Sequence, residues 1–485
     1  MSDYLYNIEP GIAEVFIKNN LKEHFNFKVG DIKPLPGYQR DIFKEFSEFR
    51  ESSRKQEKPA DVPEWYDVSD KGKWTFLPGA LADHLIKHED AFFCAEQYYF
   101  YEGGVYRAKN EKCARKRVRS FTNTRYIKYS EIVDAESQWQ ISVDKTVREI
   151  NINPYILNYE NGLYNMMEDE LTPHTPKYLS TIRLGGNHDP TAECPIFLKY
   201  LLDVLPESEL PLIQEILGYM CVPINRAQKP FVIVGAGDSG KSTFLSVVQE
   251  VLLGEENVST LTWQDLDEKF ATVQLFGKLA NVFADLPSET IRDTGTFKAI
   301  TGEDWISAQH KFKDYFSFKP FCRLLFSCNT IPKNYTDRSD GFYRRLILIR
   351  FDRTIPEDQR DPHLLDKLKL ERDGILAWAL IGLKRLVENN YRFSETDRTK
   401  AELRRYRMDN NNVLAFIEDC CTTGPDFVCY REDLYREYVE YCGLSNQRPM
   451  SRKRFNEIME MPDSGVVRGQ DSLNGRKTWK GIMRT

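Results

Sequence analysis

The sequence predicts an α/β fold built on a parallel sheet, preceded by a mixed α+β region and followed by a small separate domain. Three observations carry this prediction. Residues 231–243 read FVIVGAGDSGKST, in which four apolar residues lead into a glycine-rich segment and then into helical spacing. Short apolar runs recur at 279–284, 323–329 and 346–351, as in buried parallel strands. Beyond residue 410 the pattern changes to short helices and a hairpin signal.

The glycine-rich segment matches the phosphate-loop pattern G-x-x-x-x-G-K-S in its expected strand-to-helix context. Its glycines let backbone N–H groups converge on phosphate oxygens, and the helix N-terminus adds its dipole. Lys241 would reach the β- and γ-phosphates, and the Ser242 hydroxyl would bind Mg²⁺. An ordinary strand–turn–helix corner is the alternative, which the complete motif disfavours. The residues expected to bind a nucleoside triphosphate are Gly235, Ala236, Gly237, Asp238, Ser239, Gly240, Lys241, Ser242 and Thr243.

Length and composition indicate a multidomain globular protein. A chain of 485 residues is too long to fold around a single hydrophobic core, so three or four domains are expected. Its ten cysteines include no CxxC pair, which favours neither a zinc module nor disulfides and fits a reducing cytoplasm. No apolar stretch approaches a membrane span, and the polar start does not read as a signal peptide. The net charge of −6 argues against a wholly basic surface but allows a local basic channel or domain.

Polar residues at the ends of the predicted strands are candidates for phosphate chemistry. Asp285 closes the run 279–284, where an acid can hold Mg²⁺ or orient the attacking water. Asn329 ends the next run and could hydrogen-bond the γ-phosphate or that water. Arg344 and Arg345 precede a further strand. Such a pair is commonly a surface pair, but its place in this series also suits an arginine finger.

Basic residues gather in two further segments. Residues 304–314, DWISAQHKFKD, can form a hairpin that presents His310, Lys311 and Lys313. Residues 109–125 carry seven basic side chains on an expected helix, which suits a solvated charged face and a phosphate-contacting patch equally well.

The order of these motifs resembles that of superfamily 3 helicases. The segments GAGDSGKST, NVFADLP, HKFK, LLFSCNTIP and DGFYRRLILIRF follow one another within residues 235–351. More closely, residues 194–393 resemble the helicase half of phage and plasmid primase-helicases, which are related to the poxvirus helicase-primase. The segments TFLPGALADHL and YFYEGGVY resemble the poxvirus-type domain that precedes the helicase in that family.

This resemblance implies an AAA+ P-loop ATPase core, a hexameric ring and 3′ to 5′ translocation along one DNA strand. It also implies that Lys241 and Ser242 bind ATP and Mg²⁺ and that Asn329 is a sensor. Arg345 is expected to be the finger that acts on a neighbouring subunit. It is preferred to Arg344 because it directly precedes the LILIRF strand.

The same resemblance implies that Lys311, with His310 or Lys313, lies at the tip of the hairpin that binds DNA. One departure concerns the catalytic base, because the family usually shows two acids where this chain has Asp285 alone. Either Asp285 carries both roles or it shares them with Glu289, and both alternatives stay open.

The C-terminal residues 410–485 are expected to form a winged helix that binds DNA. Helical patterns cover 413–420, 431–441 (stopped by Gly443) and 451–461, and a hairpin turn is expected at 474–475. Residues 445–485 hold nine Lys/Arg against four Asp/Glu. Docking of a protein is the alternative. The first turn of the third helix contains three basic candidates for DNA contact, Arg452, Lys453 and Arg454.

The expected domains are therefore an N-terminal helical region and linker (1–72), the poxvirus-type domain (73–190), the helicase (191–400) and the winged helix (410–485). The first is too short for a primase domain, so priming is not expected. The expected function is that of an ATP-dependent hexameric DNA helicase replicating a phage, plasmid or mobile genetic island in a bacterial host cytoplasm. It would act on single-stranded and forked DNA, with a separate primase, polymerase or single-strand-binding protein as further partners. An origin-binding initiator ATPase and an AAA+ remodeller of proteins are the alternatives.

Overall fold

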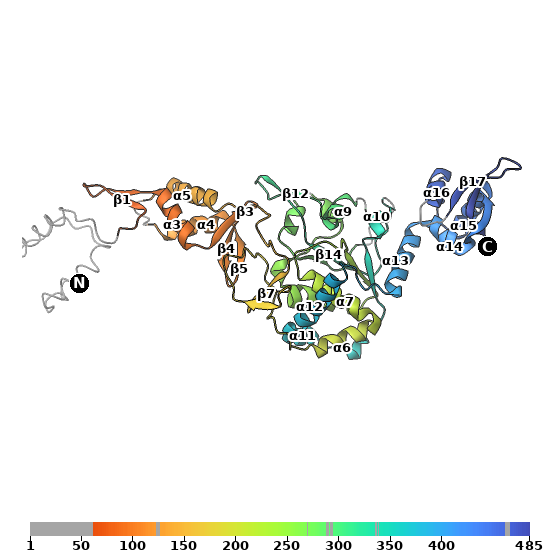
Figure 1. Cartoon of the computed structure of the whole chain (residues 1–485), viewed down its shortest axis with the longest axis horizontal. Coiled ribbons are helices and arrows are strands. Elements are labelled where there is room, and N and C mark those ends of the chain that lie inside the picture. Colours follow the sequence, from red (N-terminus) through yellow and green to blue (C-terminus); the bar gives the residue numbers. More distant parts are fainter. Residues whose placement is uncertain are drawn as a thin grey trace, which may run out of the picture.

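Figure 1 shows the chain in a computed structural model, with three parts that follow one another along its longest axis. They are an N-terminal region, a central α/β core and a C-terminal domain reached through helix α13 (Asp397–Asn410). The structure describes residues 62–122, 127–268, 270–287, 291, 294–334, 337, 339–460 and 466–485. Most of the expected N-terminal helical region and linker (1–72) lies outside these residues.

The N-terminal region packs helices against a small antiparallel sheet. Apolar residues at helical spacing predict a helix at 77–88, and the Gly-Gly pair predicts a hairpin over 92–105 that turns at 103–104. Both are confirmed: the helix is α3, and the hairpin turns at Gly103 and Gly104, which have φ angles of 56° and 88°. A further strand, β3, extends the hairpin into a three-stranded sheet. The elements are β1 (Tyr66–Val68), β2 (Trp74–Phe76), α3 (Pro78–His88), β3 (Ala91–Cys94), β4 (Gln97–Glu102), β5 (Val105–Lys109), α4 (Glu111–Ser120) and α5 (Tyr129–Ser142).

A second small sheet and a long irregular segment join this region to the core. The sheet contains β6 (Ile156–Tyr159), β7 (Gly162–Asn165) and β8 (Glu170–Thr172). The segment after it crosses between the two parts, as its proline and glycine content predicts. Arg183 shows this, because its Nη1 donates to the carbonyl of Gly103 at 2.5 Å while its own carbonyl accepts from Asn257 of the core at 2.8 Å.

The core is a five-stranded parallel sheet with the order β10-β11-β14-β9-β15. Its central strands are buried throughout, which explains why they appear in the sequence as uninterrupted apolar runs rather than as alternating ones. All three runs predicted after the phosphate loop are strands. The strands are β9 (Phe231–Gly235), β10 (Val258–Ser259), β11 (Ala280–Phe283), β14 (Arg323–Cys328) and β15 (Ile347–Phe351).

Helices cover this sheet, and β12 and β13 form a separate antiparallel hairpin. The core helices α7 and α12 are joined by an ion pair between Glu215, which is fully buried, and Arg385 Nε at 2.8 Å. The remaining core elements are α6 (Pro195–Val204), η1 (Glu207–Glu209), α7 (Leu210–Met220), α8 (Lys241–Ser246), the π-helical η2 (Val247–Leu253), η3 (Glu255–Asn257), η4 (Gln264–Asp267), η5 (Thr272–Leu275), α9 (Gly295–Thr301), β12 (Ile306–Gln309), β13 (Tyr315–Phe318), α10 (Asp340–Tyr343), η6 (Glu357–Gln359), α11 (Leu364–Leu370) and α12 (Arg372–Glu388).

The C-terminal domain has its own apolar core around Trp479, which is fully buried. Its elements are α14 (Asn412–Cys420), β16 (Cys421–Tyr430), α15 (Arg431–Leu444), α16 (Arg452–Met459), β17 (Val467–Gln470) and β18 (Lys477–Arg484). The three predicted helices and the hairpin are confirmed, and Ser451 caps α16 by accepting from the Arg454 N–H at 3.3 Å. Two details of the prediction are wrong. Helix α15 continues through Gly443 to Leu444, and β16 adds a third strand beside β18.

Within the part of the chain that the structure describes, no helix is long and apolar enough to cross a membrane.

Candidate functional site

The glycine-rich segment 235–243, which the sequence predicts to be a phosphate loop and which keeps that name below, lies between β9 and α8, as its motif predicts. Gly240 has a φ of 86°, and a Cβ added there would lie 2.8 Å from Val204. At Gly235 an added Cβ would lie 2.4 Å from the carbonyl oxygen of Phe351 on the neighbouring strand. Backbone conformation and close packing therefore require both motif glycines. The Tyr200 hydroxyl donates to the Gly240 carbonyl at 2.7 Å and holds the loop from α6.

Lys241 is buried at the centre of this loop, with 6% of its surface exposed. Its Nζ donates to the carbonyls of Gly235 at 2.8 Å and Ala236 at 2.7 Å. It also donates to the side-chain oxygen of Asn329 at 3.1 Å. A buried ammonium group held only by neutral acceptors is a strong attractor for an anion. Phosphate oxygens that replaced these acceptors would supply the missing negative charge.

The two strand-end residues lie on neighbouring strands of the sheet. Strand β14 runs between β9 and β11, so Asn329 after β14 lies beside the phosphate loop, and Asp285 after β11 lies one strand further away. Asp285 is exposed and has a φ of 53°, and its backbone N–H donates to the Ser327 hydroxyl at 3.4 Å. Glu289, the alternative acid, lies outside the described residues.

A cavity of about 1340 Å³ opens beside the phosphate loop. It is lined by loop residues 238–243, by α6, and by the segment 353–367 that follows β15. This segment is tied to the loop, because Arg360 pairs with Asp238 at 3.0 Å and the Ile355 N–H donates to the Asp238 carbonyl at 2.9 Å. Four basic residues outside the motif also line this cavity and were not predicted from the sequence: Lys199, Arg353, Arg360 and Lys367.

Arg345 lies at the amino ends of the parallel strands, whereas the phosphate loop of the same chain lies at their carboxyl ends. Strand β15 is parallel to β9, and Ile347 at its start is opposite Phe231 at the start of β9. Strand β9 has five residues and is therefore roughly 16 Å long at the usual rise per residue. Lys241 follows the far end of this strand. One Arg345 Nη donates to the carbonyl of Gly341. Burial and the neighbouring Arg344 charge lower the pKa of Arg345, whereas Arg344 itself is exposed.

The hairpin of β12 and β13 separates the three basic candidates in its loop. Lys311 is exposed at the tip, beside Phe312, which has 90% of its surface exposed. Lys313 instead forms an ion pair with Glu111 of the N-terminal region. His310 is half-buried against Phe316, and its pKa is lowered by burial. Only Lys311 among the three is thus presented to solvent, and Phe312 is an exposed aromatic that the sequence analysis did not single out.

Acids neutralise part of the basic segment at 109–125. On α4, Arg115 pairs with Glu111 at 3.1 Å and with Glu136 at 3.3 Å, and Arg117 pairs with Glu89 at 2.6 Å. These pairs favour the solvated charged face over the phosphate-contacting patch.

The basic triplet of the C-terminal domain occupies the exposed first turn of α16. Arg452 pairs with Glu432 at 3.4 Å, and Arg454 pairs with Glu457 at 2.9 Å. Among the described residues, Lys453 has no ion pair.

Two protein families match segments of the chain. Residues 60–206 match a family described as "D5 N terminal like", and residues 233–345 match a family of unknown function, DUF5906. The second segment contains the phosphate loop, Asp285, Asn329 and Arg345.

Curated relatives and one solved structure add to these matches. The "Putative helicase L207/L206" of Acanthamoeba polyphaga mimivirus is 24% identical over 216 residues, which are 42% of this chain and 22% of that protein. The "Putative helicase 184R" of Invertebrate iridescent virus 6 is 24% identical over 256 residues, 48% of this chain and 25% of that protein. The chain thus spans about a quarter of the length of the curated relatives it matches.

The apo structure of the NrS-1 C terminal region has a TM-score of 0.51 with this chain at 15% identity, and the match covers 83% of this chain and 99% of that one. At this identity the likeness concerns the fold alone. The chain is thus similar to the D5 N terminal like family over residues 60–206 and, over somewhat less than half of its length, to two viral proteins named as putative helicases.

Proposed function

We propose that the chain is an ATP-dependent DNA helicase with a superfamily 3 AAA+ core that acts as a ring of identical subunits. The observation that carries this proposal is the contact between Lys241 and Asn329. It joins the phosphate loop to the polar tip of the adjacent strand, where a sensor of the γ-phosphate would have to lie.

The residues at this site fit ATP and Mg²⁺. The loop offers a buried cation and a backbone that only glycine permits at Gly240, and the adjoining cavity is large enough for a nucleotide. Ser242 and Asp285 would hold the Mg²⁺, which neutralises charge on the phosphates when it is bound. Lys241 would bind the phosphate oxygens, and Asn329 would orient the γ-phosphate or the attacking water.

The position of Arg345 supports a shared active site. Because the sheet separates Arg345 from the phosphate loop of its own chain, it can act as a finger only on a neighbouring subunit. A closed ring supplies every loop with such a neighbour, since its interfaces are head-to-tail. A hexamer is the ring proposed here, with movement 3′ to 5′ along the strand.

The ring would hold one DNA strand through the tip of the β12–β13 hairpin. Lys311 offers a charge for a phosphate, and the exposed ring of Phe312 offers a face on which a base can stack. The C-terminal domain would bind duplex DNA as a winged helix, with α16 presenting Lys453 and Arg454.

ATP hydrolysis measured with and without single-stranded DNA, together with native mass measurement, tests this function. We expect a DNA-stimulated ATPase and a six-subunit particle when nucleotide is present. A monomer whose hydrolysis ignores DNA would contradict the proposal and would favour a remodeller of proteins.

Lys311→Ala combined with Phe312→Ala should weaken single-strand binding and uncouple hydrolysis from strand separation. Stacking contributes ~1–3 kcal/mol per base by alanine substitution, so the affinity should fall by about tenfold or more. Fluorescence anisotropy with a labelled oligonucleotide measures this loss. Lys319→Ala, which removes the same charge beyond the end of β13, is the control and should bind normally. Undiminished binding by the double variant would place the DNA contact elsewhere.

Removing residues 411–485 should preserve basal ATP hydrolysis and weaken duplex binding more than single-strand binding. The cut follows Asn410 because its side chain accepts from the buried Asn334 N–H at 2.7 Å and belongs to the core. Winged helices read duplex grooves, whereas a ring channel follows one strand. Titration against both DNA forms measures the difference. Equal duplex affinity would mean that this domain docks protein instead.

A further inference from the structure

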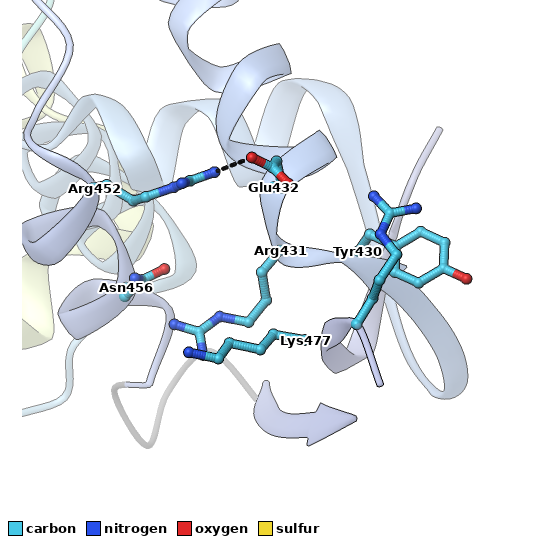
Figure 2. A pocket seen from close by; sticks show the side chains of 7 residues that line it. Tyr430, Arg431, Glu432, Arg452, Asn456 and Lys477 are labelled. Carbon is cyan, nitrogen blue, oxygen red and sulfur yellow. Dashed lines mark ion pairs between the residues drawn. The ribbon is translucent and has the colours of Figure 1, made fainter. Parts of the chain in front are cut away.

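The C-terminal domain contains a second basic feature beside the triplet of α16. A cavity of about 330 Å³ lies between the start of α15, the start of α16 and the start of β18 (Figure 2). We call it the C-terminal cationic pocket. Four of its seven lining residues are cations, and one is an acid: Tyr430, Arg431, Glu432, Arg452, Asn456, Arg476 and Lys477.

Two of the four cations are neutralised. Arg452 pairs with Glu432 at 3.4 Å, which Figure 2 marks with a dashed line, and Arg476 pairs with Asp433 at 3.2 Å. Among the described residues, Arg431 and Lys477 have no ion pair. Their charged ends point to the same side of the pocket in Figure 2. The pocket thus carries an excess of two positive charges.

This arrangement is electrostatically unfavourable without an anion. Arg431 and Arg452 are the first residues of α15 and α16, where the positive end of the helix dipole disfavours a cation. Burial, followed by the charges of Arg468 and Arg452, lowers the pKa of Arg431, although Glu460 opposes this shift.

Packing holds the charge of Arg431 in place. The Arg431 guanidinium lies 4.4 Å from the centre of the buried Trp479 ring, and this cation–π contact favours its position at the pocket. Arg476 is stacked in the same way, 3.8 Å from the Tyr430 ring centre.

We propose that the C-terminal cationic pocket binds a phosphate group of a DNA strand, with Arg431 and Lys477 holding its oxygens. A guanidinium and an ammonium on the same side of a pocket suit a phosphate group. The guanidinium can bind two phosphate oxygens, and the ammonium adds a point charge. Asn456, one turn after Arg452 on α16, adds an amide donor at the same wall. This site is separate from Lys453 and Arg454, which do not line the pocket.

The phosphate can be an internal one or the terminal phosphate of a strand end, and the inference rests on the proposed DNA-binding function. In either case the contact carries no sequence information, so it would anchor the domain while α16 contacts the groove. The pocket would then fix how the C-terminal domain sits on the duplex that enters the ring.

The test is duplex binding by the full chain, measured by anisotropy at several salt concentrations. The variants are Lys477→Gln and the double change with Arg431→Gln. Each lost phosphate contact should make the salt dependence of binding shallower by about one unit of slope, and the loss should be the same for different duplex sequences. Arg484→Gln is the matched control, because it removes the same charge from the far end of β18, where Arg484 pairs with Glu437 at 3.1 Å.

A duplex with and without 5′-phosphates separates the two sources of the phosphate. If wild type prefers the phosphorylated ends and Lys477→Gln loses that preference, the pocket binds a strand end. If wild type shows no such preference while the slope still falls, it binds an internal phosphate.

Lys477 is exposed, so Lys477→Gln remains informative if the double variant fails to fold. An affinity and slope equal to those of Arg484→Gln and wild type would overturn the pocket alone. Wild-type protein that bound no DNA would instead overturn the proposed function.

Discussion

Lys241→Ala is expected to lower ATP turnover by ~10²–10³, the loss that follows removal of one preorganised charge-stabilising donor. The structure explains the size of the effect, because Lys241 is the one lysine or arginine within the glycine-rich loop and its Nζ is already buried there. Steady-state phosphate release measures the change. Nucleotide affinity, followed with a fluorescent ATP analogue, should fall as well.

The matched control for this variant is Lys199→Ala. Lys199 lines the same cavity from α6 but is exposed and lies outside the loop. It should retain most of the turnover. Because Lys241→Ala also leaves the carbonyls of Gly235 and Ala236 without their shared donor, thermal unfolding should be recorded for each variant. A folded Lys241→Ala protein with near-normal turnover would refute the nucleotide site.

Arg345→Ala should leave nucleotide binding intact and lower hydrolysis by ~10³–10⁵, the range reported for arginine fingers. The finger acts on charge that develops during the reaction, so it contributes little to binding in the ground state. Arg344→Ala is the control, since Arg344 is the exposed neighbour of the same charge. The same loss in Arg344→Ala with none in Arg345→Ala would transfer the role to Arg344.

Mixing the two inactive variants tests whether the site is shared between subunits. A Lys241→Ala subunit still offers its Arg345, and an Arg345→Ala subunit still offers an intact phosphate loop. Mixed rings therefore contain some complete sites, and part of the turnover should return. If each mixture stayed as inactive as its components, Arg345 would not act across an interface.

The parts of the fold that were predicted correctly are those with strong local patterns. Strands β9, β11, β14 and β15 are buried on both faces, so each appears as an apolar run. Asn329, at the end of an apolar run, was expected to reach the γ-phosphate or the attacking water. Its contact with Lys241 arises because β14 lies beside β9, which the order of the motifs does not reveal.

Features that depend on tertiary contacts could not be predicted. Strand β16 contains Gly424 and Pro425, its burial does not alternate, and its register shifts between Thr423 and Val428, so its pattern is interrupted and does not indicate a continuous strand. The cavity wall at 353–367 could not be predicted either, because this segment, which includes η6 and the start of α11, lies beside the phosphate loop only through tertiary contacts. The different environments of Lys311 and Lys313 depend on Glu111, about 200 residues away, which no spacing in the sequence reveals.

Strand displacement from a forked duplex, followed with a fluorophore–quencher pair, tests the proposed helicase activity most directly. We expect displacement that needs hydrolysable ATP, requires a 3′ single-stranded arm and disappears in Lys241→Ala. DNA-stimulated hydrolysis by wild-type protein with no strand released would contradict the helicase assignment and would favour an initiator whose nucleotide cycle controls assembly on DNA.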